Sequence, residues 1–337
     1  MNTSLQAYRR TKVILIILLI AVFLLSCTLG RFPISLKDTF LLLINPLIPQ
    51  EQSWPDAAAI ALFHIRLPRL ILALFVGAGL SLAGSCFQAL FQNPMVSPDL
   101  LGAASGAGLG AALAILLGAS SFFVTLFAFG FGLASIFIVL IIAKHAQQNR
   151  VLSLILTGMI VSALFSALLS LMKLVADPTN QLPAITYWLM GSLNTLYDSK
   201  MLIALPLIFV GSLTIFLLRW QLNVLSLGDD TAKSIGLSAD TLRIILLFAA
   251  TLNTAACVSV SGMIGWVGLI IPHFSRLLVG GDHRRNIVVT ALIGGIFLIV
   301  TDDLARLVSS SEIPIGILTA FVGAPFFLHL IFRRCSE

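Results

Sequence analysis

The residues of this chain whose types and spacing could do chemistry are few, and the densest group lies between residues 222 and 238. This segment reads LNVLSLGDDTAKSIGLS and carries Asp229, Asp230 and Lys233 between two long apolar runs. A glycine-rich loop that ends in lysine and serine can bind phosphate through its backbone N–H groups. Here the loop is one residue too short and Ala232 replaces the glycine before the lysine, so we do not expect ATP to bind this chain.

Two adjacent carboxylates, Asp302 and Asp303, are the next candidates. Such a pair can act as a general acid and base. Arg306 follows Asp302 by four residues, however, and this spacing favours a local ion pair on a helix. The five histidines are dispersed and the four cysteines show no CxxC spacing, so the sequence predicts neither a metal site nor a redox site.

Arg66 and Arg69 form a basic pair just before an apolar run. Long basic side chains at a helix start often extend toward water while their stems cover apolar surface. The alternative is a landing site for an acidic partner. The residues alone leave both interpretations open.

The composition places these groups in a membrane protein. Of the 337 residues, 58% are hydrophobic and 10% are charged, with a mean hydropathy of +1.05, whereas soluble domains carry about 25% charged residues. The net charge of +6 is spread between apolar runs and not along one face, which argues against nucleic acid as a partner. The predicted fold class is an all-α polytopic membrane protein, with residues 1–337 forming one transmembrane domain.

Ten apolar runs are long enough to cross about 30 Å of hydrocarbon. They cover residues 13–29, 70–91, 98–117, 121–143, 151–174, 201–218, 242–260, 263–279, 287–307 and 313–332. With the N-terminus inside, the inner segments carry 13 of the 20 Lys and Arg residues. We therefore expect both termini and the 222–238 segment in the cytoplasm. Short helices are predicted on the outer side, at 36–44 and within 177–200.

The interiors of these runs are nearly free of ionisable groups. No Asp, Glu, Lys or Arg occurs at 70–92, 100–143, 151–172 or 244–275. An ion-coupled secondary transporter or an intramembrane enzyme would keep such groups for its work, so both alternatives are disfavoured, as is a signalling receptor. The energy source is then a separate ATPase. We interpret 222–238 as two short helices with a turn at Gly228, whose apolar side packs on a soluble partner.

Several blocks, in one order, resemble the permease family of ABC importers for cobalamin, haem and iron-siderophores. They are RLPR at 66–69, QNPMVSPDLLG at 92–102, WLMGS at 188–192, the 222–238 segment, GMIGWVGLIIPHFSRLLVGGDHR at 262–284, EIPIG at 312–316 and GAPFF at 323–327. The resemblance covers nearly the whole chain.

This resemblance implies a type II ABC importer permease of about ten helices. Such a permease forms a homodimer in the bacterial inner membrane, with two cytoplasmic ABC ATPase subunits beneath it and a periplasmic substrate-binding protein above it. ATP and magnesium bind to the ATPase subunits, so no cofactor is expected in this chain. The cargo would be a metal chelate, such as iron-siderophore, haem or cobalamin, or the oxyanion molybdate or tungstate. No motif decides between these cargoes.

The resemblance also implies roles for particular residues. Those for ATPase coupling are Leu222, Asn223, Leu225, Leu227, Gly228, Asp229, Asp230, Lys233, Gly236 and Leu237. Those for docking the binding protein are Arg66, Arg69 and Arg306, and those that close the cytoplasmic mouth are Asn93, Pro94 and Met95. Ser162, Ser166 and Ser170 lie four residues apart on the fifth apolar run. Their hydroxyls could contact an oxyanion, although helix packing explains such a spacing better.

Overall fold

The computed structural model describes residues 2–30, 32–45, 48, 54–145, 150–194, 199–309 and 311–335. Within these ranges the regular structure is entirely helical. The elements are α1 (Asn2–Thr28), α2 (Leu36–Ile44), α3 (Asp56–Ile60), a π-helical turn η1 (Ala61–Arg66), α4 (Leu67–Leu90), a 3₁₀ turn η2 (Pro98–Leu101), α5 (Ala103–Leu116), α6 (Ser121–Lys144), α7 (Arg150–Val175), α8 (Gln181–Met190), α9 (Ser199–Leu217), α10 (Arg219–Leu225), α11 (Asp229–Ser234), α12 (Ala239–Ser261), α13 (Val267–Val279), α14 (His283–Leu307) and α15 (Ile315–Cys335).

Each of the ten predicted apolar runs contains one of these helices. In the described part of the chain, seven helices are long and apolar enough to cross a membrane, and α5, α13 and the Ile315–Leu328 part of α15 are shorter apolar stretches. Helix α13 has 13 residues, or about 20 Å of length, and therefore cannot cross 30 Å by itself. Residues with positive φ limit it on both sides, namely Gly262 and Trp266 before it and Gly280 after it.

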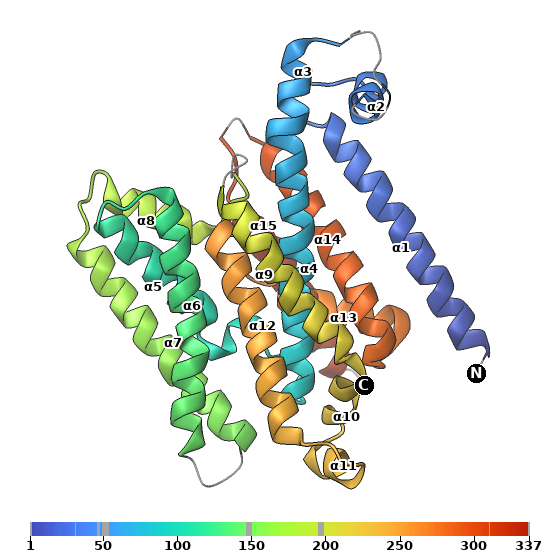
Figure 1. Cartoon of the computed structure of the whole chain (residues 1–337), viewed down its shortest axis with the longest axis vertical. Helices are drawn as coiled ribbons and strands as arrows, with labels where there is room; N and C mark the ends of the chain where they lie inside the picture. The colour runs from blue at the N-terminus through green and yellow to red at the C-terminus, as the bar shows by residue number, and fades with distance from the viewer. Residues whose placement is uncertain are drawn as a thin grey trace.

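Helices α4 and α12 form the centre of the bundle (Figure 1). Helix α4 packs against α9, α12, α13 and α14. Two of its contacts are between backbones, because a Cβ on Gly77 would lie 2.2 Å from the carbonyl oxygen of Gly294, and one on Gly84 would lie 1.8 Å from that of Gly268. Glycine is required at such contacts, so the position of α4 fixes those of α13 and α14.

The two ends of the bundle carry different short helices. Helices α10 and α11 lie at the bottom of Figure 1, whereas α2, α3 and α8 lie toward the top. Helix α2 has the bounds predicted for it, and α8 falls within the segment predicted to hold an interfacial helix. Helices α1 and α7 form opposite edges of the molecule, and both leave large apolar side chains exposed.

Candidate functional site

The segment 222–238 forms two short helices at one end of the bundle, as predicted. Helix α10 ends at Leu225, and α11 begins at Asp229 after Gly228, whose φ is 110°. Helix α11 ends in a glycine cap, since Gly236 N donates to Lys233 O at 3.0 Å and Leu237 N donates to Ala232 O at 2.9 Å. These two bonds define a Schellman motif, in which the residue at position 236 adopts the left-handed backbone conformation that glycine favours.

The apolar side of this pair packs on the chain itself. Leu222, Leu225 and Ala232 are fully buried in a cluster that includes Leu246, Leu247 and other residues of α4, α6 and α12. The expectation that this apolar side awaits a soluble partner is therefore wrong for these residues. A side chain buried inside the protein contributes to anchoring and cannot contact an ATPase directly.

Polar contacts anchor the same pair on three sides. Arg243 of α12 is 2% exposed and holds Asp229 with two bonds, Nη2 to Oδ1 at 2.5 Å and Nη1 to Oδ2 at 3.0 Å. Asn223 Oδ1 accepts from His283 N at 3.1 Å, at the start of α14. Gln92 Nε2 donates to Leu225 O at 3.4 Å. These hydrogen bonds join α11 to α12, and they join α10 to the start of α14 and to the turn that follows α4.

The opposite side of α11 is open. Leu227 is 70% exposed and Ile235 is 51% exposed, and Asp230, Lys233 and Gly236 are also exposed. The chain thus leaves two large apolar side chains and two charged ones of this segment uncovered.

The turn at Asn93, Pro94 and Met95 lies at the same end of the bundle. Asn93 Oδ1 accepts from Met95 N at 2.9 Å, and Asn93 N donates to Gln88 O at 3.1 Å. Pro94 and Met95 line a small crevice with residues of α13 and of α15, including Phe326. The structure thus brings the predicted gate turn next to the two short helices α13 and α15.

Arg66, Arg69 and Arg306 lie at the other end, where Arg66 and Arg69 are buried and Arg306 keeps a small part of its surface accessible. Arg66 is buried, and its guanidinium donates to the backbone carbonyls of Cys27, at 2.6 Å, and of Phe32. Neither snorkelling nor a free basic landing site describes it. The docking role that needs exposed charge is not supported for Arg66 or Arg69 by these positions.

Arg69 belongs to a buried ion network around Asp302. Its guanidinium lies 2.8 Å from Asp302 and 3.0 Å from Glu312. Arg306 Nε lies 3.2 Å from Asp302, as the helical spacing predicts, and Arg306 also pairs with Asp303. Ser26 of α1 donates to Asp303. The network holds the ends of α1, α4 and α14 together, and in it carboxylates offset the charges of Arg69 and Arg306.

The serines of α7 have separate environments. Ser162 is partly buried, and its Oγ would lie 3.1 Å from a Cβ placed on Gly102. Ser166 and Ser170 are exposed, and Ser170 Oγ donates to Ser166 O at 3.0 Å. They lie on a helix whose outer surface is apolar, so the structure does not gather them into a polar pocket.

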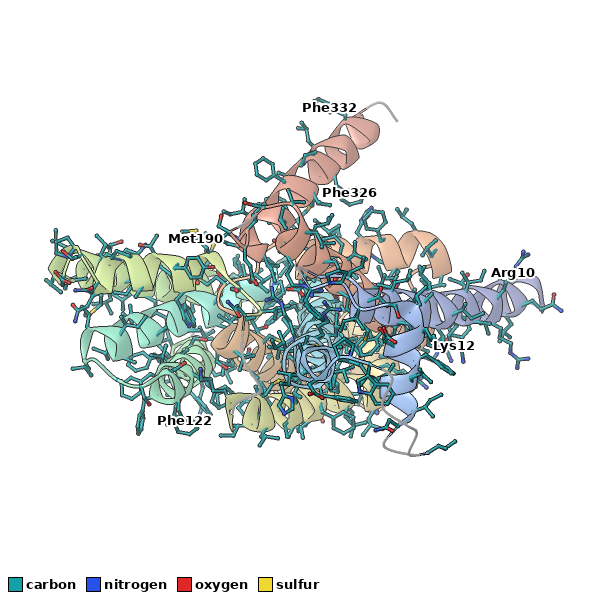
Figure 2. The ribbon with its side chains drawn as sticks, turned by 90° about the horizontal axis from the view of Figure 1, so that it is seen from above. Arg10, Lys12, Phe122, Met190, Phe326 and Phe332 are labelled. Atoms are coloured by element: carbon teal, nitrogen blue, oxygen red, sulfur yellow. The ribbon has the colours of Figure 1, made fainter. Side chains whose placement is uncertain are left out.

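A larger apolar cavity lies between α8, residues 263–266 and α15. It has a volume of about 710 Å³, and its lining includes Met190, Met263, Trp266, Phe321 and Pro325 without any charged side chain. Helix α15 projects from the bundle beside it, from Phe326 to Phe332, and Met190 lies near its base (Figure 2). Among the described residues, no three His, Cys, Asp or Glu side chains are grouped so that they could hold a metal ion.

Comparison with known proteins shows to which family the chain belongs. The sequence profile of the FecCD transport family matches residues 18–333, which is most of the chain. The chain belongs to the FecCD transport family. It is 39% identical to the molybdate import system permease protein MolB of Haemophilus influenzae over 329 residues, covering 95% of this chain and 94% of that protein. It is also 42% identical to a probable iron chelatin transport system permease protein of Helicobacter pylori, covering 82% and 84%.

A solved structure confirms the fold. An inward-facing conformation of a metal-chelate type ABC transporter superposes with a TM-score of 0.87 at 38% identity, covering 96% of this chain and 99% of that one. This shows both the all-α membrane fold expected from the apolar runs and the type II permease fold that the resemblance implied. The family resemblance inferred from short sequence blocks therefore extends over residues 18–333.

Two features of this FecCD permease were not singled out from the sequence. Gln88 is buried and bonds to the gate turn, to α13 and to Arg276. Asp99 Oδ1 accepts from Ala104 N at 2.8 Å at the start of α5, beside a cavity that Trp266 also lines. Asp99 stands three residues before Gly102, the N-cap residue of α5, so no capping pattern in the sequence marks its role.

Proposed function

We propose that this chain is the transmembrane subunit of an ATP-driven importer, and that α10 and α11 receive the movement of a separate ATPase. The observation that carries the proposal is the two-sided character of this pair. Leu227, Lys233 and Ile235 are open on one side, while Leu225 and Asp229 are bound to the bundle on the other. A short element that is rigidly anchored and openly exposed can transmit a rigid-body displacement.

The anchoring contacts lead to the gate residues. Gln92 connects α10 to the turn that contains Asn93, Pro94 and Met95, and this turn faces α13 and α15. Displacement of α11 would therefore move the walls of the cytoplasmic mouth. In this scheme no covalent step occurs in the chain, and ATP and magnesium act on the ATPase subunits.

The proposed partner of the permease in the membrane is a second copy of itself. Helices α7 and α15 both expose large apolar side chains, such as Ile160 and Leu174 on α7 and Phe321 on α15. The 710 Å³ cavity opens beside α15, so a second copy placed there would complete its wall. Such a homodimer would form one pathway between the subunits, and the Ser162, Ser166 and Ser170 face of α7 would border it.

We place the substrate-binding protein at the end that carries the Arg69 network. Arg306 and Glu312 keep part of their surface accessible there, whereas Arg66 and Arg69 support them from inside. Docking at this end would therefore depend on the shape of the surface and on both the positive charge of Arg306 and the negative charge of Glu312. With this assignment the permease lies in the bacterial inner membrane with both termini in the cytoplasm.

The proposed cargo is a metal-containing solute. The relatives named for molybdate and for iron chelatin support an oxyanion and a metal chelate respectively. The cavity beside α15 is apolar, and a pathway of this kind lets a solute pass without holding it.

The alternative is an ion-coupled secondary transporter, for which Asp99 would be the coupling group. Its carboxylate already accepts backbone hydrogen bonds at the start of α5, which accounts for its presence without transport of protons. We therefore expect an Asp99→Asn variant to keep ATP-driven uptake in vesicles whose proton gradient has been collapsed. Loss of uptake on replacement of Asp99, or on collapse of the proton gradient alone, would favour the alternative.

The central experiment measures assembly with the cognate ABC ATPase. Leu227→Asp is expected to lower co-purification of the ATPase at least tenfold while the thermal unfolding midpoint of the permease stays unchanged, because Leu227 makes no contribution to the core. Phe40→Asp is the control, since Phe40 is equally exposed on α2 at the opposite end. Unchanged assembly of the Leu227 variant would contradict the role of α11, and uphill uptake without any ATPase would contradict the function itself.

A further inference from the structure

Cations from two helices converge on one tyrosine at the end of the bundle that carries α10 and α11. Lys12 Nζ lies 6.0 Å from the centroid of the Tyr8 ring, and the guanidinium carbon of Arg285 lies 5.9 Å from it. Tyr8 and Lys12 belong to α1, whereas Arg285 lies in the first turn of α14. The start of α14 also holds α10, because His283 N donates to Asn223 Oδ1. The group therefore lies close to the pair of short helices.

The directions of these side chains follow from their spacing on α1. Tyr8 and Lys12 are four residues apart and share one face of the helix. Leu15, which is buried, continues that face toward the bundle. Arg9 flanks this face, whereas Arg10 lies about 200° around the helix from Tyr8. Figure 2 shows Arg10 and Lys12 on opposite sides of α1, so Lys12 faces the bundle and Arg10 faces away from it.

The positive charges of this group are only partly offset. Residues 1–28 contain neither Asp nor Glu. At the start of α14, Asp282 attracts Arg285, but both of its carboxylate oxygens bind Arg284. In the described part of the chain, Lys12 and Arg285 thus approach one ring from two helices without an ion pair of their own. Like charges repel each other, and an anion beside them would remove this repulsion.

The depth of the group indicates what kind of anion can reach it. Lys12 directly precedes the apolar run 13–29, so the cations lie at the level of the lipid headgroups, where tyrosine is also enriched. Further along α1, Val13, Ile16 and Ile20 are 51%, 38% and 54% exposed. Ile16 follows Lys12 by four residues, so this uncovered apolar strip begins beside the lysine. A ligand with an anionic head and an apolar tail can contact both parts.

We propose that Arg9, Lys12 and Arg285 bind the phosphate of one anionic phospholipid, with an acyl chain along the uncovered strip of α1. The lipid belongs to the leaflet on the side of α10 and α11. Clusters of Lys and Arg at the membrane surface attract such headgroups. A soluble phosphate offers the same charge but makes no use of the apolar strip. The proposal goes beyond the transport function and does not depend on it, since it uses only the positions of α1 and α14.

The test is native mass spectrometry of the delipidated full-length permease with added phosphatidylglycerol. Lys12→Gln and Arg285→Gln are each expected to lower the retained fraction of one bound lipid about fivefold, and Lys12→Arg should keep it. The matched control is Arg10→Gln, which removes one positive charge at the same level of α1 but on the side that faces away from Tyr8. Its retention should match that of the wild type. Equal retention by the wild type and the Lys12 and Arg285 variants would overturn the proposal. An equal loss in Arg10→Gln would also overturn it, because it would show attraction to surface charge without a site.

Further measurements separate the anionic lipid from other partners. Phosphatidylethanolamine, which has no net charge, should be retained weakly and to the same extent by all the variants. Inorganic phosphate in excess should not displace phosphatidylglycerol, and displacement would show a free-phosphate site and overturn the assignment to a lipid. An acidic surface of the ATPase is the competing partner. If Lys12→Gln and Arg285→Gln lower co-purification of the ATPase but leave lipid retention unchanged, the cations belong to that interface and the proposal is wrong.

Discussion

Arg276 Nη2 donates to Gln88 Oε1 at 2.6 Å, although the two residues are 188 positions apart in the chain. The amide of Gln88 also donates to Val96 O at 3.3 Å and to Leu269 O at 3.2 Å. Helix α13 contains Pro272, which cannot donate to the carbonyl of Gly268, and Gln88 Nε2 lies 3.5 Å from that oxygen. One buried side chain thus joins α4, the gate turn and the proline-interrupted helix α13.

The first prediction concerns this connection. Gln88→Leu is expected to lower the free energy of unfolding by about 1–3 kcal/mol, because it leaves buried polar groups without their partner. The amide of Val96, in the turn that Gln88 holds, should exchange its hydrogen faster. Thermal unfolding in detergent and hydrogen–deuterium exchange measure the two effects. Gln6→Leu on the exposed face of α1 is the control, and unchanged exchange at 93–97 would contradict the positioning role.

The second prediction concerns the pair of Arg69 and Asp302, whose side chains are 5% and 0% exposed. Arg69→Met is expected to cost about 3 kcal/mol or more of unfolding free energy, since it leaves Asp302 buried with one arginine fewer. Combining it with Asp302→Leu should recover part of this loss. Arg284→Gln removes the exposed pair with Asp282 and should cost less than about 1 kcal/mol. Equal losses for the buried and exposed pairs would refute the structural role of the network.

The sequence could predict the elements but not the depth of their charged side chains. The apolar runs, α2 and the turn at Gly228 follow from local patterns, namely run length, amphipathic spacing and glycine. Arg69 and Asp302, in contrast, are 233 residues apart. Nothing local distinguishes a surface arginine from one that neutralises a distant carboxylate. The same reason explains why the burial of Arg66 against the end of α1 was not foreseen.

The apolar side of α10 shows the same limit at closer range. The leucines at 222, 225 and 227 have similar local sequence surroundings, but the structure buries the first two and exposes Leu227. Helical spacing told us that one side is apolar, and it could not tell us whether the chain itself or a partner covers that side. Only the packing of α10 on α4, α12 and α14 decides this.

The third prediction concerns the Schellman motif that ends α11. Gly236 has a φ of 79°, and a Cβ there would meet no atom within 4 Å. Any effect of Gly236→Ala therefore comes from the backbone conformation and not from steric crowding. Alanine should destabilise the left-handed cap by about 1–2 kcal/mol. Gly281→Ala is the matched control, because its surroundings are equally open while its φ is not in the left-handed region.

Unwinding this cap would free the Leu237 N–H and the Ala232 carbonyl, and it would change how α11 leads into α12. If α11 transmits the movement of an ATPase, Gly236→Ala should let ATP hydrolysis continue while uptake per ATP falls several-fold. The Gly281 variant should keep the wild-type ratio of uptake to hydrolysis in the same reconstituted vesicles. The contrary outcome is a Gly236→Ala variant in which α11 is less stable but the ratio of uptake to ATP hydrolysis is normal. It would show that transport tolerates a loosened cap and that the movement passes through other contacts.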